Sequence, residues 1–167
     1  MAYKGHFKLV DDVSTHFDSI VGGANPFLQS RYVGFYAVAS AAVLELSLKQ
    51  IICDFAKQEH SLFGNYISVR YERINGRISV KNIVDEHLKP FGARYQGDFE
   101  KRLNAADSDY ITKHQFSVKS SYQSLLTCRH KFAHEGAVPA TLTYAEVKKG
   151  FLAGKAVMEC LASALVP

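Results

Sequence analysis

The chain has 167 residues, of which 47% are apolar and 22% are charged. This length and balance exclude a disordered chain and predict a single folded domain over residues 1–167 with a substantial core. The 20 Lys and Arg residues outnumber the 16 Asp and Glu residues, and the resulting net charge of +4 permits an anionic partner without requiring one.

Cysteine usage and hydropathy argue against a secreted or membrane protein. Cys53, Cys128 and Cys160 stand far apart, which predicts neither a disulfide framework nor a cysteine zinc site. The uncharged run 32–44 is shorter than the ~18 to 20 residues that cross a bilayer. Residues 1–12 lack the apolar core of a signal peptide. We therefore expect a cytoplasmic protein without a membrane partner.

Two helices are predicted in the first part of the chain. Residues 7–21 place apolar residues on one helical face, and the Gly22-Gly23 pair ends this segment. The second helix begins at Pro26, because proline is favoured in the first turn of a helix, and is expected to end at Gly64. Its apolar residues alternate steps of four and three: Ala37, Ala41, Leu44, Leu48, Ile51 and Phe55.

Residues 66–91 fit two interpretations. The alternation of apolar residues over 67–71 fits a strand, whereas their spacing over 67–74 also fits a helix. We favour two short helices separated by an Asn75-Gly76 turn, with Ser79 as the N-cap of the second helix.

The remainder of the chain contains a polar stretch and two further helices. Residues 92–109 predict an irregular segment with one short helix over 99–103. Residues 116–133 predict a helix that stops before Gly136, and residues 143–165 predict the last helix. Together these segments predict an all-α bundle with a folded helical insertion between the long second helix and the last pair.

Basic residues gather at the predicted end of the 116–133 helix. Arg129 interrupts the apolar stripe of this helix, and His130, Lys131 and His134 follow it closely. The dipole of a helix favours cations at its C-terminus. On composition alone, this effect explains the cluster better than catalysis does.

The segment 129–136, with the sequence RHKFAHEG, resembles the Arg-polar-x-x-Ala-His-x-Gly signature of the HEPN superfamily, the higher eukaryote and prokaryote nucleotide-binding domains. The segment 43–49, VLELSLK, further resembles the RiboL-PSP-type and related bacterial branches. The resemblance implies an α bundle in which the motif ends the third long helix and one more helix follows. Residues 143–165 supply that last helix.

The resemblance also implies an activity, that of a metal-independent endoribonuclease without a cofactor. Arg129 would hold the scissile phosphate, for which its planar guanidinium is suited. His134 would move a proton at the ribose 2′-hydroxyl or at the leaving oxygen, because histidine titrates near neutral pH. His130 stands where the family carries a supporting polar residue.

Helix geometry separates the two motif residues Arg129 and His134. Residues five apart are separated by about 140° around an ideal helix, so Arg129 and His134 do not converge within one helix. The family answers this with a dimer in which two motif helices form a composite cleft. We therefore expect a homodimer that acts on RNA.

Glu45 and Lys49 on the second helix are two further supporting candidates. They lie one turn apart, where a salt bridge would stabilise the helix by about 0.3 kcal/mol. The resemblance implies instead that Glu45 approaches the motif and orients Arg129 or a histidine. The sequence leaves both explanations open.

Other polar residues also have two explanations. His130 and His134 share a helical face like a pair of metal ligands, but no third ligand follows by spacing, so we expect no metal site. A basic and aromatic patch could track an RNA backbone, although a solvated helix face is the more frequent explanation. The candidate RNA-binding residues are Lys131, Arg70, Arg73 and Arg77.

Three functions compete on this sequence. We expect a ribonuclease that acts as a bacterial toxin or antiviral effector, with an antitoxin or defence-system protein as its partner. The alternatives are a non-catalytic module that binds RNA, a nucleotide or a protein, and a purely structural helical dimer. The presence of both Arg129 and His134 favours the ribonuclease, because a binding module does not need both.

Overall fold

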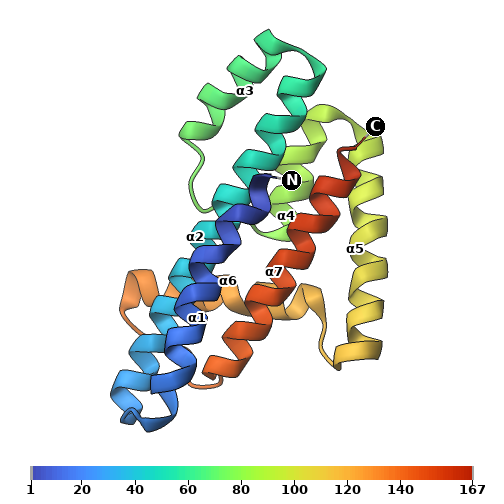
Figure 1. Ribbon diagram of the computed structural model, residues 1–167. Helices are drawn as coiled ribbons and strands as arrows, with labels where there is room; N and C mark the ends of the chain where they lie inside the picture. Colours follow the sequence, from blue (N-terminus) through green and yellow to red (C-terminus); the bar gives the residue numbers. More distant parts are fainter. Residues whose placement is uncertain (1, 167) are drawn as a thin grey trace.

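The computed structural model describes residues 2–166, and this range contains helices and turns but no strand (Figure 1). The elements in chain order are η1 (Ala2–Phe7), α1 (Lys8–Ile20), η2 (Val21–Gly23), α2 (Pro26–Glu59), α3 (Ser61–Glu72), α4 (Val80–Asn82), the π-helical turn η3 (Ile83–Leu88), η4 (Lys89–Phe91), α5 (Ala93–His114), α6 (Val118–Glu135) and α7 (Tyr144–Ala164). The all-α class is confirmed. The helical insertion is confirmed too, because α3 to α5 lie between α2 and α6.

Helix α2 is the central element of the bundle and packs against α1, α3, α6 and α7. Asn25 caps its start by accepting a hydrogen bond from the Leu28 N–H at 3.0 Å. Gly154 of α7 allows α2 and α7 to approach closely, because a side chain there would overlap Leu44. The predicted apolar positions of α2 are all buried: Ala37, Ala41, Leu44, Leu48, Ile51 and Phe55.

The predicted end of the second helix at Gly64 is wrong. Helix α2 ends at Glu59, where His60 adopts an extended backbone, and α3 begins at Ser61. Gly64 lies inside α3 and is buried against Lys57, whose backbone a side chain at position 64 would touch. This glycine therefore permits the close packing of two successive helices and does not stop one.

The Asn75-Gly76 turn between two short helical segments is confirmed, and the strand alternative is wrong because residues 67–71 lie within α3. Ser79 caps the second segment by accepting a hydrogen bond from the Asn82 N–H at 3.1 Å. Gly76 has a φ of 71°, a left-handed conformation that favours glycine.

The irregular segment predicted over 92–109 is wrong, because α5 is one continuous helix of 22 residues. Its apolar stripe is narrow: Phe99 and Leu103 are buried, and Tyr95, Ala106 and Tyr110 are partly buried beside them. The helix packs on α7 along this stripe and is mostly polar elsewhere, with Ile111 as an exposed apolar residue. A narrow stripe suffices here because α5 covers the bundle from outside.

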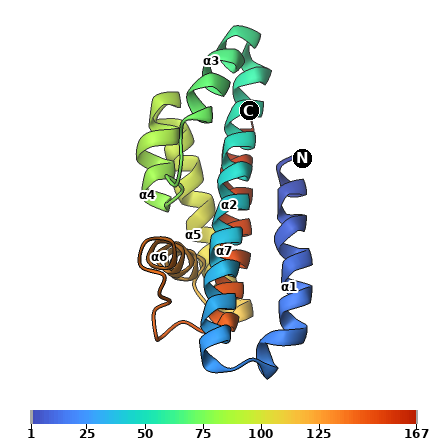
Figure 2. The ribbon, with the colours of Figure 1, turned by 90° about the vertical axis from the view of Figure 1, so that its left-hand side faces the viewer.

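Helix α6 crosses the long axis of the bundle, so that Figure 2 shows it end-on while α2 runs upright in front of α7. Ser117 caps its start by accepting a hydrogen bond from the Ser120 N–H. Gly136 ends it in a left-handed conformation, φ 66°, with its N–H bonded to the Phe132 carbonyl at 3.0 Å. The predicted stop of this helix is confirmed.

By length and composition alone, α2 resembles a helix that could cross a membrane, with a mean hydropathy of 1.4 over its most apolar window. In the structure 56% of that window is buried inside the bundle. Burial against the other helices accounts for its apolar character.

Candidate functional site

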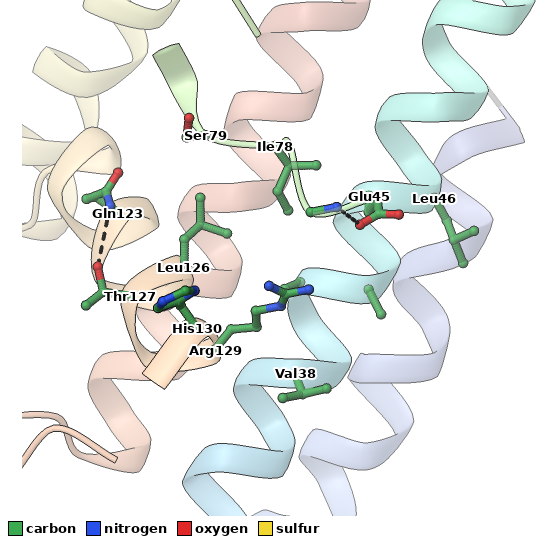
Figure 3. A pocket seen from close by; sticks show the side chains of 13 residues that line it. Val38, Glu45, Leu46, Ile78, Ser79, Gln123, Leu126, Thr127, Arg129 and His130 are labelled. Atoms are coloured by element: carbon green, nitrogen blue, oxygen red, sulfur yellow. Dashed lines mark hydrogen bonds between the residues drawn. The ribbon is translucent and has the colours of Figure 1, made fainter. Parts of the chain in front are cut away.

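A cavity of about 560 Å³ lies between α2, α6 and the loop of residues 73–79 that follows α3 (Figure 3). Its polar lining residues are Glu45, Ser79, Gln123, Thr127, Arg129 and His130. Its larger apolar lining residues are Val38, Leu46, Ile78 and Leu126. The cavity thus combines a strong cation with apolar walls, which is the usual composition of a small-molecule or nucleotide site.

The 73–79 loop is held against both helices of the cavity. The Glu45 carboxylate of α2 accepts a hydrogen bond from the Gly76 N–H at 2.7 Å. The Tyr122 hydroxyl of α6 donates to the Ile78 carbonyl at 2.6 Å, and both side chains are buried. The third wall of the cavity is therefore fixed by direct bonds to the other two.

A buried histidine anchors the same loop from the insertion. His87 Nε2 lies 2.7 Å from the Arg77 carbonyl and Nδ1 lies 2.8 Å from the Tyr71 hydroxyl. A neutral ring with its proton on Nε2 satisfies both contacts, donating to the carbonyl and accepting from Tyr71. Burial lowers the pKa of His87 below its usual value, which favours this neutral ring.

Arg129 extends from α6 into the cavity toward the 73–79 loop (Figure 3). A Cβ atom at Gly76 would lie 3.6 Å from Arg129 Nη2, so the glycine backbone directly faces the guanidinium. Arg129 is half-buried, yet within residues 2–166 it makes no hydrogen bond or ion pair. A half-buried guanidinium with free donors is suited to bind an anion.

Glu45 lies in the same cavity, but its oxygens are engaged elsewhere. Oε1 is 2.9 Å from Lys49 Nζ and Oε2 holds Gly76. The predicted salt bridge with Lys49 is therefore confirmed. The direct contact with Arg129 or a histidine, which the alternative requires, is absent in the described part of the chain. Glu45 instead shapes the cavity through the loop, and its ion pair with Lys49 balances its charge.

The two motif histidines lie against each other outside the core, with their ring planes tilted by 51°. Their ring centroids are 4.5 Å apart and both side chains are exposed. His130 lines the cavity, whereas His134, one turn further along α6, does not. No group of three His, Cys, Asp or Glu residues that could hold a metal ion occurs in the range 2–166.

Phe132 packs the C-terminal end of α6 against α2. The Phe132 ring covers Gly34, where a side chain would overlap it. Arg31 lies over the rings of Phe27 and Phe132, with Cζ 4.8 Å and 5.9 Å from their centroids, and donates to the Gly136 carbonyl. These contacts fix the helix turn that carries His130 and His134.

The other predicted RNA-binding residues lie apart from the cavity. Arg70 of α3 and Arg73, the residue that follows this helix, are exposed and line a shallow hollow together with Tyr66. Arg77 is ion-paired with Glu86 at 2.8 Å. Lys131 is half-buried and lies 200° around α6 from Arg129, on the opposite side of the helix by the ideal spacing of about 100° per residue.

Sequence reasoning missed two cavity residues on α6, Gln123 and Thr127. With His130 and His134 they form a polar stripe at steps of four, three and four, the spacing of one helical face. This spacing was visible in the sequence. The contribution of the 73–79 loop was not, because it depends on bonds between residues far apart in the chain.

We expect the free energy of unfolding to fall as the pH drops from about 7 to 5, because of His87. Its folded pKa is lowered from 6.5 by burial, so below pH 6.5 the unfolded chain binds a proton that the folded protein resists. The stability is complete above pH 6.5 and is lost as the pH falls toward the folded pKa. One proton limits the slope to about 1.4 kcal/mol per pH unit.

Urea unfolding at a series of pH values measures this slope. The His87→Gln variant is the control, because an amide can still donate to the Arg77 carbonyl but does not titrate in this range. Its slope should be shallower than that of the wild-type protein. Equal slopes would show that His87 does not carry the effect.

Comparison with known families identifies the RiboL-PSP-HEPN family, whose model matches residues 6–166. The matched range includes every helix from α1 to α7 and the 129–136 segment. Neither the curated proteins nor the solved structures give a significant match.

Proposed function

Because this chain belongs to the RiboL-PSP-HEPN family of the HEPN superfamily, we propose that it is a metal-independent endoribonuclease. Membership of this family indicates a nuclease or another RNA-related function. The finer assignment rests on the groups around the cavity. There Arg129, with its free donors, lies near the polar stripe that contains His130 and His134.

The observation that carries the proposal is the state of Arg129. Its guanidinium lies at the cavity without an acidic partner within residues 2–166, although Glu45 lines the same space. Burying part of a cation without a counter-charge is unfavourable unless a ligand supplies one. A phosphodiester supplies that charge and matches the planar donors of the guanidinium.

The proposed reaction needs a proton acceptor, a proton donor and stabilisation of negative charge. The ribose 2′-oxygen attacks the adjacent phosphorus, the P–O5′ bond breaks, and a 2′,3′-cyclic phosphate and a 5′-hydroxyl form. One imidazole takes the 2′-hydroxyl proton and one protonated group gives a proton to the leaving 5′-oxygen; His134 performs one of these transfers. Arg129 stabilises the charge on the phosphoryl oxygens, and His130 supports the site by a hydrogen bond.

A homodimer completes the site in this proposal. Arg129 lines the cavity and His134 does not, so a second chain would bring its own His134 to the phosphate. The face of α2 beside the cavity carries exposed apolar side chains, with Phe35 57% and Leu46 48% exposed, and Phe27 and Leu28 lie further along the helix. Such a surface is suited to the second copy of the chain.

Basic residues away from the cavity would add affinity for a longer RNA. Arg70 and Arg73 make no ion pair in the described part of the chain, and Tyr66 offers an exposed ring beside them. Lys131 would add positive charge, and Arg77 would add less, because Glu86 already pairs with it.

We propose that the enzyme acts in the cytoplasm as a bacterial toxin or antiviral effector. This role comes from analogy with small members of the superfamily and not from the chemistry of the site. Its partner would be an antitoxin or another protein of a defence system, which would control an otherwise harmful ribonuclease.

The purified wild-type protein is expected to cleave labelled single-stranded RNA, in the presence of EDTA, to products ending in 2′,3′-cyclic phosphate. DNA of the same sequence should stay intact, because it lacks the attacking 2′-oxygen. Gel analysis with and without EDTA measures the cleavage of the RNA and of the DNA. Loss of cleavage in EDTA with recovery in a divalent ion would overturn the metal-independent mechanism, and equal cleavage of DNA would remove the 2′-hydroxyl step.

The second candidate is a non-catalytic module that binds RNA, a nucleotide or a protein. It is favoured by one observation, that the cavity of a single chain contains Arg129 but not His134. Tight RNA binding by the wild-type protein with no cleavage would support this candidate over the nuclease.

A further inference from the structure

The cavity extends beyond Arg129 into a space that the phosphate chemistry does not use. Its volume of about 560 Å³ exceeds what one phosphate group needs and falls in the range of small-ligand sites. Apolar side chains line it from all three walls: Val38 and Leu46 from α2, Ile78 from the loop and Leu126 from α6.

Two polar side chains of this space have unused hydrogen-bonding capacity. Gln123 Nε2 lies 3.4 Å from Thr127 Oγ1, a contact at the limit of hydrogen-bond length, and neither side chain has another hydrogen-bond partner within residues 2–166. Ser79, by contrast, is occupied by its two bonds with Asn82. The Gln123 amide and the Thr127 hydroxyl are therefore available to a ligand.

Arg129 and the two free polar groups line the cavity at different levels of α6. Gln123 and Arg129 are six residues apart on α6, about 9 Å along the helix axis. Figure 3 shows Gln123 and Thr127 on the α6 side of the cavity and Val38 and Leu46 on the α2 side.

We propose that the cavity is a nucleobase subsite, in which Gln123 and Thr127 bind the polar edge of the base next to the phosphate held by Arg129. The inference rests on the proposed ribonuclease function and adds base selectivity to it. A base has two apolar faces and one polar edge, which the apolar walls and the two free polar groups complement. A wholly apolar ligand would use none of the hydrogen-bonding groups of Arg129, Gln123 and Thr127.

The test titrates the four nucleoside 3′-monophosphates into the intact protein by calorimetry, which needs no cleavage. The wild-type protein should prefer at least one base. Gln123→Met, which keeps the size of the side chain but removes both hydrogen-bonding groups, should reduce that preference about five- to tenfold. Thr127→Val should reduce it in the same direction, and Arg129→Ala should weaken all four nucleotides together.

Gln58→Met is the matched control, because Gln58 is exposed on α2 but does not line this cavity. It should leave both affinity and base preference unchanged. Equal binding of the four nucleotides by the wild-type protein, absence of binding, or a preference that survives in Gln123→Met would each overturn the subsite. Thermal unfolding checks that every variant remains folded. If Gln123→Met does not fold, the loss or survival of the base preference in Thr127→Val decides whether the subsite exists.

The RNA cleavage assay separates the subsite from the proposed function. Cleavage of RNA without a Gln123-dependent base preference would remove the subsite and leave the ribonuclease. A Gln123-dependent preference in nucleotide binding, without cleavage of any RNA, would support the subsite and remove the ribonuclease.

Discussion

Replacing His134 by alanine is expected to slow RNA cleavage by about 10²- to 10⁴-fold, the usual contribution of a general acid or base. His134 is exposed and makes no hydrogen bond within residues 2–166, so the free energy of unfolding should change by less than about 0.5 kcal/mol. RNA binding should persist, because Arg129 and the other basic residues remain. Single-turnover cleavage and a binding titration measure the two quantities separately.

His16→Ala is the matched control for this prediction. His16 is also an exposed histidine, but it lies on α1 and away from the cavity. Its removal should leave the cleavage rate unchanged. A His134→Ala protein that cleaves RNA as fast as the wild-type protein would exclude His134 from proton transfer and point to His130, the other histidine of the stripe.

Much of the fold follows from local apolar spacing. The α2 pattern from Ala37 to Phe55 was sufficient to place a buried core helix, and Gly136 was sufficient to end α6. The same reasoning was wrong for Gly64, because a glycine that permits helix packing and a glycine that ends a helix are alike in sequence. It was wrong for α5 because a stripe built on Phe99 and Leu103 is too narrow to stand out from its polar surroundings.

The candidate site was only partly predictable for a different reason. The motif on α6 is local, so Arg129, His130 and His134 could be singled out together. The wall of the cavity depends on the bond between Glu45 and Gly76, which are 31 positions apart, and no local pattern indicates such a pairing. Sequence spacing therefore locates the groups on one helix, while the space they face is a property of the tertiary structure.

Mixing two inactive variants, Arg129→Ala and His134→Ala, is expected to restore RNA cleavage. Arg129 lines the cavity and His134 lies outside it, so we propose that each site combines Arg129 of one chain with His134 of the other. In a mixed dimer one of the two sites then contains both groups intact. An equal mixture that exchanges subunits contains half mixed dimers, which predicts about a quarter of the wild-type rate.

The control is the double variant Arg129→Ala/His134→Ala mixed with wild-type protein at the same ratio. In that mixed dimer each composite site lacks one group, so the activity should come from the wild-type dimers alone. These make up about a quarter of the dimers, which again predicts about a quarter of the wild-type rate. If each chain instead carried its own complete site, the two single variants would stay inactive on mixing. The double-variant mixture would then keep about half of the rate, because the wild-type chains would work in any dimer.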